Sequence, residues 1–376
     1  MSEVLELTKE LIRKQSITPL DEGCQELVAA RLEKLGFEIN HLPFGEVSNL
    51  WATYGKGKKT LTLLGHTDVV PTGPIEEWTN DPFEPTERDG LLYGRGTADM
   101  KGSVAAFVVA AERFCKENGN PNGKLSIMLT SDEEGPAKDG VKKVIKYLTE
   151  NGEKIDWCLV GEPTAEKKLG DVIKVGRRGS INGVINIKGI QGHAAYPHNA
   201  KNPIHLGSYA LQEIVNLKWP DETGKFPDSI LQVSNINAGT GAHNVIPGEM
   251  QLKLNVRYSP SISSQTVKEA VEGILKSYNL DFIAEWEESG SPFLTTSNTL
   301  IDSVVESISA VTGINDVEQS TSGGTSDGRF IAPTGSEVVE IGPLNASIHK
   351  IDEAVNIKEL EKLVEIYLRV MTKLLS

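Results

Sequence analysis

The sequence is poor in cysteine and contains no long apolar run. Its three cysteines, Cys24, Cys115 and Cys158, are too few and too scattered for a disulfide framework or a zinc site built from thiolates. We therefore expect buried thiols in a reducing cytoplasm. No apolar run approaches the roughly 20 residues that cross a bilayer, and residues 1–7 lack the basic and apolar regions of a signal peptide. We expect no membrane as a partner.

Basic residues are scarce relative to acidic ones. Lysine and arginine together number 38 against 52 aspartates and glutamates, which gives a formal net charge of −14. This charge opposes binding to a nucleic-acid backbone or an anionic membrane surface, so no nucleic acid is expected as a partner either. The length of 376 residues exceeds what one hydrophobic core usually supports, and two domains are therefore expected.

The pattern of apolar residues changes at about Arg178. Before this point apolar runs alternate with amphipathic stretches, which is typical of an α/β sheet with crossover helices. After it the elements follow the order βαββαβ, which predicts a split-βαβ, ferredoxin-like sandwich of ~110 residues, and the α/β pattern then resumes. We therefore expect a smaller domain at residues 179–291, inserted into a larger one made of residues 1–178 and 292–376. The predicted strands are 49–54, 60–65, 125–130, 157–160, 180–189, 230–236, 249–258, 281–287 and 337–341, and the predicted helices are 21–35, 102–117, 139–149, 203–217, 263–277, 297–312 and 357–375.

Histidine and carboxylate side chains follow three of the predicted strands where each strand ends. His66 and Asp68 follow strand 60–65, Glu133 and Glu134 follow strand 125–130, and Glu162 follows strand 157–160. Because the carboxyl ends of parallel strands share one edge of a sheet, we expect these side chains in one crevice. Alone, each would more often be a capping or solvated residue; together they indicate a site.

Two further residues extend this set: Asp99, just ahead of a predicted helix, and His349 in a late loop. Imidazole and carboxylate groups are the ligands of a catalytic zinc site, and this many ligands fits two metal ions that share a carboxylate. Asp68, two residues from His66, is expected to accept from the second ring nitrogen of that histidine. Adjacent Glu133 and Glu134 should diverge, so that one binds metal and the other stays free as a general base.

Several strings resemble a known family. GHTDVVP (65–71), GRG (94–96), DMKG (99–102) and DEEG (132–135) are similar to hallmark segments of the dizinc aminoacylase, deacetylase and carboxypeptidase superfamily. The resemblance covers essentially the whole chain. It implies a zinc-exopeptidase-like α/β catalytic domain at 1–178 and 292–376, with an inserted lid and dimerisation domain at 179–291. The strings GRRGS (176–180), GHAAYPH (192–198), NVIP (244–247) and TSGGTSDGRF (321–330) resemble its desuccinylase branch and are partly shared with acetylornithine deacetylases.

The resemblance implies a role for each candidate ligand. Two Zn²⁺ ions per subunit are expected, with Co²⁺ as a possible substitute. Glu133 is implied as the general acid and base, with Asp68 beside it in the catalytic set. The peptide bond between Asp99 and Met100 is expected to be cis. The implied metal ligands are His66 and Glu162 for one ion, Glu134 and His349 for the other, and Asp99 as the bridge.

The resemblance also implies a homodimer formed through the lid domain. His193 would reach the active site of the partner subunit and donate to the developing oxyanion, and Asn244 would assist from the same loop region. A turn histidine after a strand is the alternative for His193. Nothing in the periodicity of the sequence supports the dimer independently.

An anionic substrate approaching a protein of this charge needs local cations. Arg177 and Arg257 are the first candidates, because arginine offers a bidentate fork to a carboxylate. Arg257 lies on the polar face of a predicted strand, where a solvated residue is the alternative. By the same resemblance the weaker substrate contacts are Ser180, Tyr196, Gly324, Thr325 and Asn345.

The expected activity is hydrolysis of a small-molecule N-acyl amino acid. The favoured substrate is N-succinyl-LL-2,6-diaminopimelate, cleaved to succinate and LL-2,6-diaminopimelate in lysine biosynthesis. Deacetylation of N-acetylornithine and dipeptide hydrolysis are the alternatives that keep the chemistry. A non-catalytic binding protein on the same fold is the alternative from another class, although such a protein has no need of a free base beside a complete ligand set.

Overall fold

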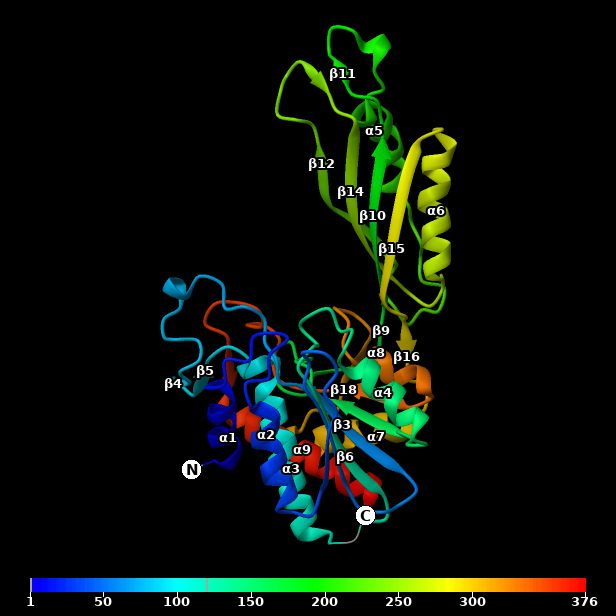
Figure 1. The fold of residues 1–376 in the computed structure, drawn as a ribbon. Helices are drawn as coiled ribbons and strands as arrows, with labels where there is room; N and C mark the ends of the chain where they lie inside the picture. The colour runs from blue at the N-terminus through cyan, green and yellow to red at the C-terminus, as the bar shows by residue number, and fades with distance from the viewer. Residues whose placement is uncertain (1, 120) are drawn as a thin grey trace. The chain divides into compact units, whose positions relative to one another are not determined.

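The computed structural model describes residues 2–119 and 121–376 and divides into two compact units, coloured by residue number in Figure 1. Unit 1 comprises Met1–Gly176, Leu294–Ser320 and Ser326–Ser376, and unit 2 comprises Arg177–Phe293 and Thr321–Thr325. The larger unit is therefore interrupted by the smaller one, and the chain passes between them at the short strands β9 (Gly176–Arg177) and β16 (Phe293–Leu294) and on either side of the 321–325 segment.

The grouping of Thr321–Thr325 with unit 2 differs from the sequence-based division, which places all of 292–376 in the larger domain. Hydrogen bonds explain the difference. The Thr321 hydroxyl donates to the Lys225 carbonyl at 2.7 Å, and the Arg177 guanidinium donates to the Ser322 carbonyl at 3.1 Å. These contacts join residues 96 and 145 positions apart, and no local sequence pattern predicts them.

Unit 1 is built on a mixed eight-stranded sheet in the order β1-β2-β6-β3-β7-β18-β8-β17. Strands β6, β3, β7 and β18 are parallel to one another, whereas β2 pairs antiparallel with β1 and β6, and β8 pairs antiparallel with β18. Every residue of β3 is buried, which fits a strand covered on both faces. The bounds are β1 Glu38–His41, β2 Asn49–Tyr54, β3 Thr60–His66, β6 Lys124–Thr130, β7 Trp157–Val160, β8 Val172–Lys174, β17 Glu318–Ser320 and β18 Glu337–Glu340; a separate small sheet contains β4 Thr86–Arg88, β5 Leu91–Tyr93 and β19 Ala354–Asn356.

Helices α1, α2, α3, α7 and α9 contribute to one hydrophobic core against this sheet. Alternate strand residues such as Leu61, Leu63 and Ile127 face that core and are fully buried. Helices α4 and α8 do not contribute to this core, and α8 contacts β7 and β18. None of the helices within the described ranges is long and apolar enough to cross a membrane. The bounds are α1 Glu3–Ile12, α2 Cys24–Glu33, α3 Gly102–Glu117, α4 Val141–Glu150, α7 Asn298–Thr312, α8 Gly328–Ile331 and α9 Ile357–Leu375, with short turns at η1 Ile75–Glu77, η2 Thr97–Lys101 and η4 Ala332–Thr334.

Helix α2 begins later than predicted. The sequence pattern places its start at residue 21, but Gly23 adopts a left-handed conformation with φ of 82° and the helix begins at Cys24. The Asp21 carboxylate accepts a hydrogen bond from the Gln25 backbone N–H, which satisfies one donor of the first turn. Cys24 and Cys158 are buried as expected, and Cys115 is partly buried.

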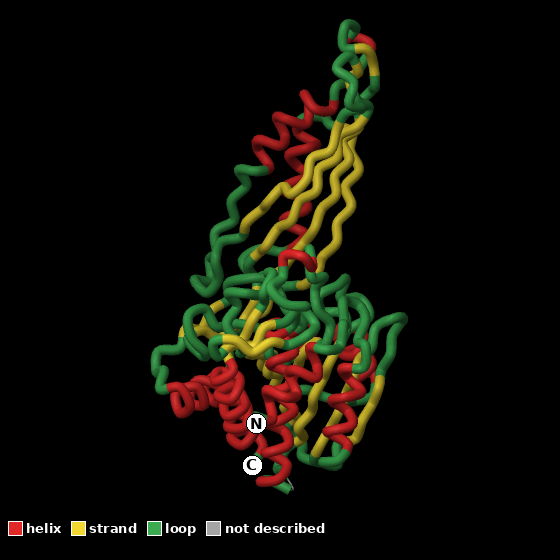
Figure 2. Tube along the Cα trace, turned by 90° about the vertical axis from the view of Figure 1, so that its left-hand side faces the viewer, coloured by secondary structure: helices red, strands yellow, loops and turns green. Residues whose placement is uncertain are grey.

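Unit 2 has the predicted βαββαβ order. Its four-stranded antiparallel sheet runs β12-β14-β10-β15, and Figure 2 shows these long strands side by side with helices along one face. Ile181, Ile185 and Leu252 of the sheet pack in one core with Val267 and Val271 of α6. The bounds are β10 Gly179–Lys188, β11 Gly192–His193, α5 Pro203–Ile214, β12 Ile230–Ala238, β13 Val245–Ile246, β14 Glu249–Tyr258, α6 Ser264–Ser277 and β15 Asp281–Gly290, with a short turn at η3 Pro197–Asn199.

The core of unit 1 predicts a stability effect at Leu363, a fully buried residue of α9. Leu363→Ala is expected to lower the free energy of unfolding by about 2–5 kcal/mol, because it removes buried methyl groups and leaves a cavity. The exposed neighbour Lys362 provides the control, since Lys362→Ala should change it by less than about 0.5 kcal/mol. Urea unfolding followed by circular dichroism measures both variants, and equal midpoints would contradict this packing.

Candidate metal centre

Three parallel strands of unit 1 end at the same edge of the sheet, as the sequence predicts. His66 is the last residue of β3, where it lies opposite Thr130 of β6, and Leu64 lies opposite Val160 of β7. The residues that follow β6 and β7 therefore emerge beside His66. Glu133, Glu134 and Glu162 are among them.

Asp99 presents one carboxylate oxygen to each of two histidines. Its Oδ1 lies 3.2 Å from His66 Nε2, and its Oδ2 lies 3.2 Å from His349 Nε2. Glu134 Oε1 lies 3.1 Å from the same His349 nitrogen, and Glu162 Oε1 lies 3.8 Å from His66 Nε2. Asp99 thus stands between two pairs, each a histidine with a glutamate. The Asp99–Met100 peptide bond is cis, which confirms the prediction.

Among residues 2–119 and 121–376, two sets of side chains have ligand atoms within 4.8 Å of one another: His66, Asp99 and Glu134, and His66, Glu133 and Glu162. The five predicted ligands are therefore brought together from distant parts of the chain. Glu133 belongs to the second set, so its carboxylate lies within 4.8 Å of the ligand atoms of His66 and Glu162. Glu133 and Glu134 point to different partners, as expected for adjacent residues.

The ring of His66 is oriented by the backbone of Asp68. Its Nδ1 lies 2.8 Å from the Asp68 carbonyl oxygen, so Nδ1–H donates to that oxygen and Nε2 faces the carboxylates. This differs from the expectation that the Asp68 carboxylate would accept from His66, because that carboxylate is 3.7 Å from the ring nitrogen. The Asp68 carboxylate accepts instead from the backbone N–H groups of Glu133 at 3.4 Å and Glu134 at 3.1 Å, in the turn after β6.

The buried charges of the cluster shift each other's protonation. Burial and the nearby Asp327 carboxylate raise the pKa of Glu133 well above its usual range, and burial together with Asp99 does the same for the pKa of Glu162. Hydrogen bonds to Asp99 and Glu134 raise the pKa of His349 to about 10. Burial opposes a charge on His66, but the Asp99 hydrogen bond and the carboxylates around it outweigh burial and raise its pKa.

This donor set fits a pair of divalent cations. The carboxylates of Asp99, Glu133, Glu134 and Glu162 outnumber the imidazoles of His66 and His349 in a largely buried cluster. Divalent cations neutralise such an excess and displace the protons that the histidines would otherwise hold. Nitrogen and carboxylate oxygen ligands suit zinc and its first-row neighbours.

Two residues beside Glu133 have no role in the sequence-based assignment. Arg329 Nη1 lies 3.8 Å from Glu133 Oε1, and Arg329 Nη2 lies 3.7 Å from Asp327 Oδ1. Both residues are almost fully buried, and burial raises the pKa of Asp327 to about 6 although Arg329 opposes this. The sequence feature that could have pointed to Asp327 and Arg329 is the TSGGTSDGRF string. Its last residues reach the strand-end cluster, whereas its first residues belong to unit 2.

Predicted substrate residues of unit 2 form two separate groups. His193 pairs with Val245 across β11 and β13, next to Asn244, and the Tyr196 ring lies 5.6 Å from the His193 ring. The side chains of His193, Tyr196 and Asn244 are exposed. The structure therefore brings these three predicted residues together on one loop region, beyond the end of β10 in Figure 1.

The second group lies at the start of β10. Ser180 is opposite Arg257 of β14, and the Arg257 Nε–H donates to Asn255 Oδ1 at 3.1 Å. Asn255 in turn donates to Ser180 Oγ at 3.2 Å. Arg177 donates to the Ser322 and Gly324 carbonyls, which places it against the predicted Gly324–Thr325 contact.

The remaining predicted contact, Asn345, belongs to unit 1, where its backbone N–H donates to the Ala165 carbonyl at 2.9 Å and its side chain is partly exposed. It lies four residues before His349 in the same loop.

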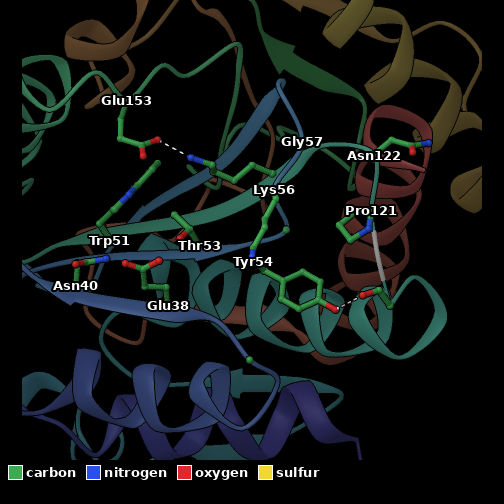
Figure 3. Close-up of a pocket in the computed structure, with 14 residues that line it drawn as sticks. Glu38, Asn40, Trp51, Thr53, Tyr54, Lys56, Gly57, Pro121, Asn122 and Glu153 are labelled. Atoms are coloured by element: carbon green, nitrogen blue, oxygen red, sulfur yellow. Dashed lines mark hydrogen bonds and ion pairs between the residues drawn. The ribbon is translucent and has the colours of Figure 1, made fainter.

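A cavity of about 980 Å³ lies over the β1–β2 edge of the unit 1 sheet, as Figure 3 shows. Glu38, Trp51 and Thr53 line it from the strands. Its Glu153 carboxylate is paired with the Lys124 ammonium at 2.7 Å. No histidine lines this cavity, so it lacks the ligand set of the strand-end cluster.

Comparison with known proteins identifies the family. Residues 62–373 match the model of peptidase family M20/M25/M40. The chain is 52% identical over 375 residues to a succinyl-diaminopimelate desuccinylase of Thioalkalivibrio sulfidiphilus and 52% identical over 376 residues to one of Xylella fastidiosa, each match covering 100% of both chains. The family resemblance drawn from the motifs is thereby confirmed.

Solved structures show the same fold at low identity. An M20 family metallo-carboxypeptidase of Sulfolobus solfataricus matches with a TM-score of 0.82 and 20% identity, over 99% of each chain. The YXEP protein of Bacillus subtilis, described as a dinuclear metal binding peptidase, matches with a TM-score of 0.73 and 17% identity, over 98% of this chain and 97% of that one. The predicted α/β fold with an inserted split-βαβ domain is therefore confirmed. The chain belongs to peptidase family M20/M25/M40.

Proposed function

We propose that this hydrolase cleaves the amide bond of N-succinyl-LL-2,6-diaminopimelate, releasing succinate and LL-2,6-diaminopimelate for lysine biosynthesis. Its full-length relatives at 52% identity carry the name of that activity. The observation that carries the chemistry is Asp99, whose two oxygens each lie 3.2 Å from a different histidine, with Glu133 beside them. This arrangement suits amide hydrolysis with two metal ions and a nearby base.

We further propose that the metal ions are zinc, with cobalt as a substitute. His66 and Glu162 would hold one ion, Glu134 and His349 the other, and Asp99 both. When bound, such a pair lowers the pKa of a water molecule and polarises the amide carbonyl.

Glu133 takes the proton of the attacking water and returns it to the departing amine. Burial raises the pKa of its carboxyl, which suits a group that must both accept and donate a proton near neutral pH. The Asp68 carboxylate supports this role by accepting hydrogen bonds from the backbone N–H groups of Glu133 and Glu134. These bonds fix the turn that carries both side chains.

Arg257 and Arg177 recognise the carboxylates of the substrate. Asn255 orients Arg257 through a hydrogen bond at 3.1 Å, and Arg177 supports the Ser322–Gly324 backbone. A succinyl group carries a carboxylate that an acetyl group lacks, so a charged fork at this place distinguishes the two substrates. Ser180, Tyr196, Gly324, Thr325 and Asn345 are the further proposed contacts.

The protein acts as a homodimer joined through the lid domain, and His193 of the partner subunit completes the active site. The geometry of unit 2 supports this proposal. Strand β10 separates Ser180 from the His193 loop and spans ~30 Å at about 3.3 Å per residue, farther than a small N-acyl amino acid extends. One chain therefore cannot bring both groups to one substrate without a second copy. The three free cysteines fit a reducing cytoplasm as the location.

The first test concerns the substrate. On one dizinc preparation, kcat/KM for N-succinyl-diaminopimelate should exceed that for N-acetylornithine and for a dipeptide panel by at least ~100-fold, because the other substrates lack the succinyl carboxylate that the arginine binds. Arg257→Gln should reduce this preference at least ~10-fold, mainly through KM. Lys253→Gln, an exposed residue on the same face of β14, is the matched control. A preference for N-acetylornithine would overturn the substrate assignment and leave the metal centre intact.

The second test separates base from ligand. Glu133→Gln should lower kcat by about 10²–10⁴-fold while the protein retains two metal ions per chain, since the amide can neither accept nor return the proton. His349→Ala should retain about one metal ion per chain, because it removes a ligand from one site only. Elemental analysis after dialysis and initial rates measure both variants. Loss of metal from Glu133→Gln would mark Glu133 as a ligand, and full activity would exclude it as the base.

The third test concerns the partner's contribution. Glu133→Ala and His193→Ala chains, each inactive alone, are coexpressed with different affinity tags and the hybrid dimer is isolated. About half of the wild-type activity per dimer should return, because one of its two sites combines an intact Glu133 with His193 of the partner subunit. An inactive hybrid would show that His193 acts within its own chain or not at all.

A further inference from the structure

The carboxylate of Glu353 is buried next to the loop that carries Asp99, and both of its oxygens accept hydrogen bonds. Only 1% of the residue is exposed. Its Oε2 accepts from Arg95 Nη1 at 2.8 Å and from the Gly96 backbone N–H at 3.0 Å. Its Oε1 accepts from the backbone N–H groups of Ala98 at 2.9 Å and Asp99 at 3.1 Å. This one side chain therefore holds the backbone of the loop that presents Asp99.

Arg95 joins this carboxylate to the loop that carries His349. Its Nη1 also donates to the Lys350 carbonyl at 3.0 Å, and its Nη2 donates to the Pro71 carbonyl at 3.3 Å. The guanidinium lies 5.1 Å from the ring of Trp78, whose indole N–H donates to the Thr72 carbonyl. The arginine is almost fully buried, so its charge depends on Glu353 as its partner.

These contacts fix the separation of two proposed ligands. Glu353 follows His349 by four residues, and its carboxylate accepts a hydrogen bond from the backbone N–H of Asp99. The Oδ2 atom of Asp99 lies 3.2 Å from His349 Nε2. His66 and Glu162, in contrast, are placed by strands β3 and β7 of the central sheet. The His349–Asp99 pair is therefore held by loops and needs an anchor that the His66–Glu162 pair does not.

The His349 loop would not hold its shape without support. His349 has a φ of 60° and Asp352 a φ of 55°, in the left-handed region that residues other than glycine rarely adopt. Asp352 is tied to Thr79 by two hydrogen bonds, and Glu353 ties the next position to the Asp99 loop. The loop is thus fixed by side chains at its far end.

Glu353 is not itself a ligand candidate. Both of its oxygens already accept two N–H donors each, and it belongs to neither of the two clusters with metal-binding spacing in the described part of the chain.

We propose that Glu353, anchored by Arg95, is a positioning residue that keeps Asp99 and His349 at the separation required by one metal ion of the pair. This inference rests on the proposed metal centre. It predicts an asymmetric effect, in which the ion held by Glu134 and His349 loses affinity while the ion held by His66 and Glu162 is retained. Residues that orient ligands in this way typically change metal affinity by ~10–100-fold.

The test is a Co²⁺ titration of metal-free protein, followed by visible absorption and calorimetry. Glu353→Gln keeps the size of the side chain but turns an amide N–H₂ toward one pair of N–H donors. It should weaken the affinity for the Co²⁺ ion held by Glu134 and His349, the second to bind, ~10–100-fold. The affinity for the first ion, held by His66 and Glu162, should fall less than ~3-fold, and the absorption spectrum of the dicobalt form should change. Arg95→Lys keeps the charge but loses the planar fork to the Lys350 carbonyl, and should weaken the second Co²⁺ ~10-fold.

Glu112→Gln provides the matched control. Glu112 forms a two-point ion pair with Arg31 between α2 and α3, at 2.8 and 3.0 Å. Removing that pair should lower the urea midpoint of the metal-free protein but leave both Co²⁺ affinities unchanged, which distinguishes general destabilisation from positioning.

Wild-type affinities for both Co²⁺ ions in Glu353→Gln would overturn the inference, as would an equal loss at both sites. If Glu353→Gln fails to fold, Arg95→Lys decides between the same outcomes. A wild-type chain that binds fewer than two Co²⁺ ions would overturn the proposed metal pair itself, so the two failures are distinguishable.

Discussion

A single carboxylate shared between two histidines is the constraint on which the site depends. Asp99 has one oxygen 3.2 Å from His66 and the other 3.2 Å from His349, and these histidines lie 283 positions apart in the chain, at 66 and 349. Shared ligation of this kind works only when both oxygens are aimed correctly. The neighbouring structure serves that purpose: the parallel sheet places His66, and the Glu353 contacts place the backbone of Asp99.

The acidic composition of the chain acquires a specific meaning at this cluster. Burying several carboxylates beside two imidazoles is costly in the absence of cations, because each charge loses its hydration. The proposed metal ions, which would bind only the folded chain, would recover that cost and so link the stability of unit 1 to its metal content. The acidic composition therefore does more than oppose nucleic-acid binding, because some of the carboxylates belong to this buried cluster.

Local patterns were sufficient for β3, β6 and β7, which carry site residues at or just beyond their ends, because these strands are buried almost throughout and polar residues follow. Strands β2, β7 and β14 and helices α3 and α9 have the predicted bounds. The contacts that orient the site were not predictable in this way. The Asp68 carbonyl rather than its carboxylate faces His66, and Glu353 reaches Asp99 across 254 positions, since hydrogen bonds between distant loops leave no periodicity in the sequence.

The same fold supports related proteins with different described activities, which bears on where specificity resides. A metallo-carboxypeptidase and a tripeptidase match this chain with TM-scores of 0.82 and 0.80 at 20% and 22% identity. Fold alone therefore does not select the substrate. The ligands proposed at the strand ends would have to suit two metal ions, which leaves little freedom of residue type. The substrate contacts proposed in unit 2 are under no such requirement. Arg257, Asn255 and Ser180 lie on the polar face of its sheet, where a substitution would change the proposed recognition without disturbing the core. Substrate choice can change there while the metal centre stays the same.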